Sequence, residues 1–524
     1  MTTYTAPVKD MMFLFEKLRN NKNYNEIEKY KEVTPELVKD ILEEAAKINQ
    51  NLILPLAKVG DENPTILENG VVRTPPGYKE AYAKFIADGW TSLSCDPKYG
   101  GQGMPKTVSA FFDEMLSSAS LSFKLYSELS IGAYNCIHHH ATEEIKNKYL
   151  PKMVEGKWSG TMCLTEPVCG TDLGLLKTKA EEQPDGTFKL NGQKIFITSG
   201  DHDLTENIIH LVLARIPGGP TNTKGLSMFI VPKFIVDENG FSGARNNLRC
   251  MNIEKKMGIH GNATCEMLYD QAKGYLIGDV NKGLNSMFVM MNIARVQTGM
   301  QGLAISELAR QKAIDYSKHR IQGKERGGIH GPVKIIKHPD LKRILSEITS
   351  FTEGARAVAL WTALLMDIDK ENLEGLTEVE AKHLLGFLTP IVKAYFTDNA
   401  FLKTSEALQC FGGYGYIKDY EIEQLVRDVR VAMIYEGTNS IQAMDLVFRK
   451  VLLDNGYSIN IFSRLVQDLT NDFPSELDKQ IVTVMNESLT QLNEALIWLK
   501  KRKSLNDIGS IEASAVYFLK LCGH

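Results

Sequence analysis

Apolar residues recur at helical spacing from the N-terminus to about Trp158, as in Leu37, Ile41 and Ala45, and this spacing predicts a helical unit. From about Gly160 the period changes, and short β-rich runs stand between turn signals: residues 188–190, 194–198, 208–214, 226–231 and 265–269. Runs of this length and spacing predict an antiparallel barrel or sandwich. The dipeptide Asn191-Gly192 predicts a tight turn.

The helical period returns from about Leu284 to Asp454, and its long segments include residues 340–367 and 379–411, the second interrupted by Pro390. These segments predict a helix bundle. Residues 461–524 are again helical, and one face carries four leucines: Leu489, Leu492, Leu496 and Leu499. This segment could be an added helical cap, a dimer contact or a surface-binding amphipathic segment, and we favour packing.

The order of these patterns predicts an α+β protein in four parts. They are an N-terminal helical domain (1–158), a middle β-barrel or β-sandwich domain (159–280), a C-terminal four-helix bundle (281–455) and an appended helical segment (456–524). We find no internal repeat of fixed period and no low-complexity tract. A chain of 524 residues is too long for one core, so several units are expected.

Composition narrows the class of protein. A hydrophobic fraction of 43%, a charged fraction of 24% and a net charge of -4 predict a soluble globular protein. Lys and Arg are spread among Asp and Glu, so nucleic-acid binding has no support. Residues 1–10 lack a secretory pattern, and no run of about 18 apolar residues predicts a transmembrane helix. The eight cysteines form no Cys-x-x-Cys pair, which favours reduced thiols and a cytoplasmic location.

The hexapeptide from Ile434 to Asn439 is the strongest candidate for chemistry. Glu436 follows an uncharged run, residues 431–435, so its carboxylate would be partly desolvated and its pKa raised toward a value useful to a base. The alternative is a solvated Glu at a helix C-terminus, with Gly437 as the stop and Thr438 or Asn439 capping the next helix.

Two further segments belong to the β region. In residues 161–172 a β-run breaks into a loop rich in hydroxyls and small residues, which could hold a planar heterocycle and a nearby phosphate; the alternative is an ordinary turn. Residues 193–200 form a strand with an aromatic residue and a hydroxyl beside it. Taken alone, either segment is more typical of core structure than of a cofactor site.

A glycine-rich segment, residues 409–416, lets the backbone approach another group closely. It lacks the last glycine of Gly-x-Gly-x-x-Gly and follows a helix, so a nicotinamide-binding doubly wound domain is disfavoured. No Gly-x-x-x-x-Gly-Lys-Ser/Thr motif is present, which disfavours a nucleotide hydrolase.

Three other features, a run of histidines, a cysteine and an arginine, could suggest a functional site. Adjacent side chains in His138-His139-His140 point to different sides of a helix, so we expect no metal site. Cys410 is better explained by packing than as a nucleophile. Arg295 lies in an apolar helical run, where it needs a functional anion, a buried partner or an exit to the surface.

Taken together, the segments from about Lys39 to Phe448 resemble the acyl-CoA dehydrogenase family. The family pattern Leu-Thr-Glu-Pro-x-x-Gly-Ser-Asp matches residues 164–172 with Thr171 for the serine, and its strand motif Gln-Lys-x-Trp/Phe-Ile-Thr matches residues 193–198. Gln-x-x-Gly-Gly-x-Gly-Tyr matches residues 409–416, and Tyr-Glu-Gly-Thr matches residues 435–438. Four matches in the family's order make the resemblance specific.

Within the family, the chain is most similar to the longer bacterial branch that includes 3-(methylthio)propionyl-CoA dehydrogenase. This similarity rests on residues 99–105, 172–176, 196–203 and 257–261. Some family members place the base just before the arginine at position 295. Here that position is Ala294, so no carboxylate competes with Glu436.

The resemblance implies an FAD-dependent acyl-CoA dehydrogenase with Glu436 as the catalytic base. It implies that the flavin is lined by Met162, Leu164, Thr165, Gly170 and Thr171 and closed on its other side by Phe196, Ile197 and Thr198. It implies cofactor contacts from a neighbouring subunit through Arg320, Gln409, Gly412 and Gly413, and contacts to the adenosine or phosphate part through Thr438 and Asn439. The implied substrate contacts are Thr171, Arg295, Tyr435 and Gly437.

A homodimer or homotetramer is therefore expected, with acyl-CoA as substrate and an electron-transfer flavoprotein as electron acceptor. Two alternatives stay open: an acyl-CoA oxidase that reduces oxygen, and a flavin-binding relative that does not dehydrogenate. The length of the acyl chain is not set by these motifs, because one methylene in a pocket changes binding by only about 1–3 kcal/mol.

Overall fold

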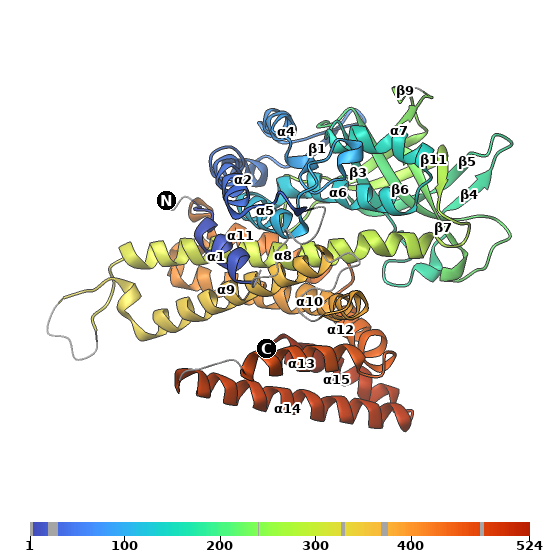
Figure 1. The fold of residues 1–524 in the computed structure, drawn as a ribbon. Helices are drawn as coiled ribbons and strands as arrows, with labels where there is room; N and C mark the ends of the chain where they lie inside the picture. The colour runs from blue at the N-terminus through green and yellow to red at the C-terminus, as the bar shows by residue number, and fades with distance from the viewer. Residues whose placement is uncertain (1–3, 19–29, 239, 326–330, 368–375, 472–475) are drawn as a thin grey trace. The chain divides into compact units, whose positions relative to one another are not determined.

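The computed structural model describes residues 4–18, 30–238, 240–325, 331–367, 376–471 and 476–524 (Figure 1). The chain divides into two compact units. The first unit holds Met1–Val8, Glu36–Ala294 and Phe411–Asp428. The second unit holds Lys9–Pro35, Arg295–Cys410 and Val429–His524. A long helix, α8 (Gly283–His319), contributes to both.

The N-terminal part of the first unit is helical, as predicted. Its longer helices are α2 (Pro35–Ile48), α3 (Leu54–Glu62), α4 (Tyr78–Ala87), α5 (Lys106–Ala119), α6 (Leu121–His140) and α7 (Glu143–Val154), and α11 (Ile422–Val429) joins them from later in the chain. Helix α6 begins where the hydroxyl of Ser120 accepts a hydrogen bond from the amide of Phe123 at 3.3 Å. Nearly all of its residues are buried, which explains the dense apolar pattern in this region.

The helical prediction missed one hairpin. Strands β1 (Ile66–Glu68) and β2 (Val71–Arg73) pair in antiparallel fashion. The turn between them is made by Asn69 and Gly70, with φ angles of 52° and 75°. Both angles lie in the left-handed region, which asparagine and glycine adopt most readily, so the dipeptide is the signal for this turn.

The middle of the chain folds into a closed β structure. Its strands are β3 (Trp158–Cys163), β4 (Lys179–Glu182), β5 (Phe188–Thr198), β6 (Asn207–Arg215), β7 (Leu226–Pro232), β10 (Leu248–Ile253) and β11 (Thr264–Ile277), and a separate pair is formed by β8 (Phe234–Val236) and β9 (Ser242–Arg245). Strand β7 pairs with both β6 and β11, which closes a ring through β5 and β4. Most pairs are antiparallel, but β6 pairs in parallel with β3 and with β4, which the sequence did not predict.

The turn predicted at Asn191 and Gly192 is wrong. Strand β5 runs straight through both residues, which pair with Asp270 and Tyr269 of β11. Glycine is required there for a different reason: a Cβ at position 192 would lie 2.3 Å from the hydroxyl oxygen of Thr178. The two predicted runs, 188–190 and 194–198, are therefore one strand.

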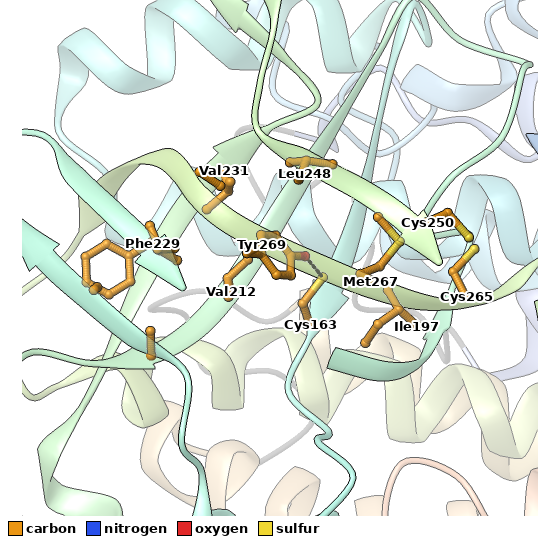
Figure 2. Close-up of a cluster of buried hydrophobic side chains, with 14 of the residues drawn as sticks. Cys163, Ile197, Val212, Phe229, Val231, Leu248, Cys250, Cys265, Met267 and Tyr269 are labelled. Carbon is orange, nitrogen blue, oxygen red and sulfur yellow. Dashed lines mark hydrogen bonds between the residues drawn. The ribbon is translucent and has the colours of Figure 1, made fainter. Parts of the chain in front are cut away.

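The interior of this β structure is apolar. Figure 2 shows buried side chains from several strands, among them Val212, Phe229, Leu248 and Met267. The hydroxyl of Tyr269 satisfies its hydrogen-bonding need inside the core by donating to Sγ of Cys163 at 3.2 Å (Figure 2). Figure 2 also places Ile197 in this core; its side chain is 2% exposed.

The second unit is helical. Its longer elements are α1 (Val8–Leu18), most of α8, α9 (Pro339–Asp367), α10 (Glu378–Cys410), α12 (Asn439–Met444), α13 (Tyr457–Asn471), α14 (Glu476–Ser504) and α15 (Ile508–Gly523). A wide helical turn, η12 (Asp445–Leu452), continues α12, and the single turn η11 (Arg430–Met433) precedes the Glu436 segment. The interruption predicted at Pro390 is wrong, since α10 continues through this residue.

The appended segment packs within the second unit. Leu489, Leu492, Leu496 and Leu499 of α14 are between 1% and 9% exposed. Helix α14 contacts α13, η12 and α15. The apolar face predicted from sequence is therefore a packing face, as favoured above.

Candidate functional site

Two sequence motifs far apart in the chain meet in the β structure of the first unit. The hydroxyl of Thr161, on β3, donates to the carbonyl oxygen of Thr198, on β5, at 2.7 Å. The amide of Ile195 donates to the carbonyl oxygen of Thr165 at 2.9 Å. The loop after β3 is thereby fixed against β5, so the segments 161–172 and 193–200 form one site.

A buried ion pair fastens the same loop. Nζ of Lys194 lies 2.9 Å from Oε1 of Glu166 and also donates to the carbonyl oxygen of Leu164 at 2.9 Å. The two charged side chains are 0% and 4% exposed. Glu166 also accepts from the amide of Lys177 at 2.6 Å and from the hydroxyl of Thr178 at 2.5 Å. Burial opposes ionisation of Glu166, but Lys194 and these donors outweigh it and lower the pKa of the carboxyl group.

A β-bulge in β5 presents an aromatic ring on the surface of this site. Ile195 and Phe196 together face one residue of β11, Glu266. The bulge gives Phe196 a left-handed φ of 57° and leaves its side chain 59% exposed. A bulge that redirects a side chain and a non-glycine residue with positive φ are both enriched beside functional sites.

The other residues expected at the flavin differ in accessibility. Met162, Leu164, Thr165 and Thr198 are half-buried, and Gly170 and Thr171 are exposed. Because the side chain of Ile197 lies in the core, it can offer a cofactor only its backbone. An exposed ring, accessible hydroxyls and an open glycine form a donor set that fits a flat polar heterocycle such as an isoalloxazine ring.

The residues expected to reach a cofactor from a neighbouring subunit lie on the surface of the described chain. Arg320, Gln409, Gly412 and Gly413 are all exposed. A Cβ built on Gly412 or Gly413 would meet no atom within 4 Å, and Gly412 has a φ of 59°. The backbone at these glycines is therefore open to a group that approaches closely.

The Glu436 segment is a tight turn in the second unit. Glu436 and Gly437 have left-handed φ angles of 58° and 85°. Nε2 of the buried Gln442 donates to the carbonyl oxygens of Glu436 at 3.0 Å and of Gly437 at 3.3 Å. Thr438 stands at the N-cap position of α12, as the capping alternative expected, but its side chain makes no cap bond. A non-glycine residue held with positive φ stores backbone strain, which is common at functional positions.

Asn439 attaches this turn to helix α10. Its Oδ1 accepts from Nζ of Lys393 at 2.7 Å. Its Nδ2 lies 2.6 Å from Oδ1 of Asp398, 2.9 Å from the hydroxyl of Thr397 and 3.2 Å from the carbonyl oxygen of Ala394. The side chain of Asn439, expected from sequence to meet a cofactor, is thus used inside the protein.

Arg295 and Tyr435 also have partners within the second unit. Nη1 of the buried Arg295 lies 3.2 Å from Oδ2 of Asp445, so a buried partner is the explanation that the structure supports for this arginine. The hydroxyl of Tyr435 donates to the side-chain oxygen of Gln301 on α8. This bond fixes the ring that precedes Glu436.

Sequence reasoning assigned no role to Lys194, Lys393 or Gln442. Lys194 could have been found, since a lysine within an apolar β-run needs a carboxylate partner, and Glu166 stands in the neighbouring motif. Lys393 lies in a long apolar helix, where lysine usually extends its charge to water. Gln442 carries no comparable signal.

The described residues contain no group of three or more His, Cys, Asp or Glu that could hold a metal ion. His138 is held by Asp96, with Nε2 and Oδ2 3.1 Å apart. All eight cysteines lie within the described ranges, and each has a free thiol. None of the described helices combines the length and apolar character needed to span a bilayer.

Comparison with known proteins identifies the family. Residues 36–157 match the family model for the acyl-CoA dehydrogenase N-terminal domain, residues 161–272 the middle domain and residues 281–451 the C-terminal domain. The chain belongs to the acyl-CoA dehydrogenase family. It is therefore an oxidoreductase of the flavoprotein type that acts on CH–CH bonds of acyl-CoA, as the resemblance in the sequence implied.

Matches to other proteins extend over most of this acyl-CoA dehydrogenase family chain. The 3-methylmercaptopropionyl-CoA dehydrogenase of Ruegeria pomeroyi is 42% identical over 465 residues, which are 88% of this chain and 79% of that protein. A chain from a structure described as the electron transferring flavoprotein of Acidaminococcus fermentans is 26% identical with a TM-score of 0.65, and the match covers 78% of this chain and 96% of that chain.

The appended helices have a counterpart in the fold of a solved structure. Caenorhabditis elegans ACDH-11, solved in complex with C11-CoA, matches with a TM-score of 0.81 at 21% identity. The match covers 99% of this chain and 85% of that chain. At this identity the likeness shows the fold alone, and it includes the region after residue 455.

Proposed function

We propose that this protein is an FAD-dependent acyl-CoA dehydrogenase in which Glu436 removes the Cα proton of an acyl-CoA to give a trans-2-enoyl-CoA. The observation that carries this proposal is the Glu436 turn: the only Tyr-Glu-Gly-Thr motif of the chain places a carboxylate on a left-handed backbone held by Gln442. FAD, when bound, supplies the acceptor for the hydride that leaves Cβ.

The chain's own residues give Glu436 the conditions that a base needs. An acyl thioester is a very weak carbon acid, so proton removal requires stabilisation of the negative charge that develops on the thioester oxygen. We assign this role in part to the backbone amide of Glu436, whose position is fixed by the turn. Tyr435, held by Gln301, and Gly437 would contact the acyl chain beside the base.

The cofactor would be held mainly by the site on β3 and β5. Phe196, Thr165 and Thr171 offer a ring and hydroxyls, and the pair of Glu166 and Lys194 keeps the loop that carries them in place. Arg320, Gln409, Gly412 and Gly413 would serve the cofactor of a neighbouring subunit, so the active form is proposed to be a homodimer or homotetramer. Thr438 would reach the distal part of the cofactor, whereas Asn439 would contribute there only through its backbone.

Electrons would pass to an electron-transfer flavoprotein. One solved structure that contains a chain similar to this one is titled for the electron transferring flavoprotein of Acidaminococcus fermentans, which makes such a flavoprotein the first acceptor to test. The identity of 42% to the methylmercaptopropionyl-CoA enzyme makes short acyl-CoA esters, with or without a thioether, the first substrates to test. We also propose that the chain consists of four domains, with boundaries at residues 158, 280 and 455.

The experiment is an anaerobic titration of the purified protein with acyl-CoAs of graded length and with 3-(methylthio)propanoyl-CoA. Loss of flavin absorbance with at least one of them, together with formation of the enoyl-CoA, is the expected result. A yellow protein that keeps its absorbance with the whole panel would reject dehydrogenation. Rapid peroxide release in air, without any added acceptor, would instead identify an oxidase.

A further inference from the structure

Lys393 is a cation buried inside the second unit. It lies in the middle of α10, among apolar neighbours in the sequence, and it is 0% exposed. An ammonium group is costly to bury unless it is paired and hydrogen-bonded. Nζ of Lys393 donates a hydrogen bond to Oδ1 of Asn439, 2.7 Å away, and Asn439 lies three residues after Glu436.

Residues of α10 hold the side-chain amide of Asn439 on both sides, and we call these contacts the Asn439 clasp. Nδ2 of Asn439 reaches the carbonyl oxygen of Ala394, the hydroxyl of Thr397 and the carboxylate of Asp398, all on α10. Lys393 therefore holds one side of the amide while its helix neighbours hold the other. Since the turn from Glu436 to Asn439 is only four residues long, fixing Asn439 restricts where the Glu436 carboxylate can lie.

Among the charged groups of the described residues that act on Lys393, Glu436 does most to favour the charge of the lysine. Burial lowers the pKa of Lys393 to about 7, while Glu436 and then Asp398 act to raise it and Arg295 to lower it. Arg295 is itself paired with Asp445. The interaction between Lys393 and Glu436 is mutual, so an ammonium at Lys393 must favour the ionised form of Glu436.

We propose that Lys393 is a positioning residue for the base: it holds the Glu436 turn through Asn439, and its charge keeps Glu436 ionised and ready to accept a proton. This inference rests on the proposed function, in which Glu436 is the base. Lys393 exchanges no proton with the substrate. It acts through its charge and through Asn439, and this action fades when Lys393 itself loses its proton.

Three variants distinguish the effect of the Lys393 charge from the effect of the contacts that hold Asn439. Lys393→Met keeps the length of the side chain and removes the charge, and Lys393→Arg keeps a permanent charge. Thr397→Val removes one hydroxyl from Asn439 and leaves Lys393 in place. Circular dichroism and flavin content show which variants fold before any rate is compared.

The measurement is kcat/KM for butyryl-CoA as a function of pH. For the natural protein we expect an acid limb from Glu436 and a second transition near pH 7 from Lys393. Lys393→Met should move the acid limb up by at least about one pH unit and remove the second transition. Lys393→Arg should keep the acid limb and lose the second transition, and Thr397→Val should keep both.

An unchanged acid limb in a folded Lys393→Met protein would overturn the inference, as would an equal displacement in Thr397→Val. Infrared titration of the Glu436 carboxylate, with Glu436→Gln as the reference, gives the same comparison without substrate. If the natural protein reduces no flavin with any acyl-CoA, the proposed function fails, and the infrared displacement caused by Lys393→Met still decides whether Lys393 sets the ionisation of Glu436.

Discussion

Nζ of Lys194 lies 2.9 Å from the carboxylate of Glu166, and both groups are buried, so two motifs 28 residues apart share one ion pair. Lys194→Met should leave a buried carboxylate without its cation and lower the free energy of unfolding by about 3–5 kcal/mol. Because the pair fixes the loop after β3, the same variant should lose flavin more readily. Urea unfolding and flavin content on purification measure both effects.

The double variant Lys194→Met with Glu166→Gln is the control. It removes both charges, so it should recover part of the stability that the single change loses. If the double variant is as unstable as the sum of the two single variants, the pair contributes by packing and not by charge.

Asp428 should make stability depend on pH. It accepts a hydrogen bond from the amide of Ile259 at 2.6 Å, and burial raises the pKa of the Asp428 carboxyl group from its ordinary value of 3.8 to about 6. The folded protein thus holds this proton when the unfolded chain has lost it, so the unfolding free energy should fall as pH rises from about 4 to about 6. Asp428→Asn should remove this fall and stabilise the protein above pH 6 by about 1–3 kcal/mol.

Denaturant unfolding at several pH values tests this expectation. Asp340→Asn, at an exposed carboxylate, is the control and should follow the natural protein. A difference between Asp428→Asn and the natural protein that stays constant from pH 4 to pH 8 would contradict the assignment.

Gly192 should tolerate no side chain. A Cβ there would lie 2.3 Å from the hydroxyl oxygen of Thr178 and 2.9 Å from its Cα, so Gly192→Ala should destabilise by about 1–3 kcal/mol. Thr178 also donates to Glu166, so the loop should loosen as well. Gly354→Ala is the matched control: this exposed residue in α9 has no atom near its Cβ position, and alanine there should stabilise by about 0.5–1 kcal/mol. Equal effects at both positions, measured by thermal unfolding, would refute the steric argument.

The sequence predicted most of the architecture where one pattern ran long enough. The helical period over residues 340–367 and the four leucines of α14 each led to elements that the structure contains. The turn at Asn191 and Gly192 failed because β5 pairs along both edges there, and a local dipeptide preference yields to that pairing. The same dipeptide at Asn69 and Gly70, in a short exposed hairpin, kept its usual conformation.

Some residues of the candidate site were predicted from the sequence and others were not. Glu436 was found because a short motif and its order in the chain match a family. Lys393 was not found, because its partner Asn439 lies 46 residues further along the chain. Neither local sequence contains a pattern that predicts this contact. Contacts between distant residues of unlike segments can be assigned only once the helices that carry them are packed.

The role of Glu436 is the central claim, and anaerobic mixing of the Glu436→Gln variant with butyryl-CoA or 3-(methylthio)propanoyl-CoA tests it most directly. The variant keeps the size of the side chain and loses the base, so it should retain FAD and reduce its flavin at least about 100-fold more slowly than the natural protein. Glu144→Gln, at an exposed position of α7, should reduce at the natural rate. A Glu436→Gln protein whose flavin absorbance falls as fast as that of the natural protein would contradict the account.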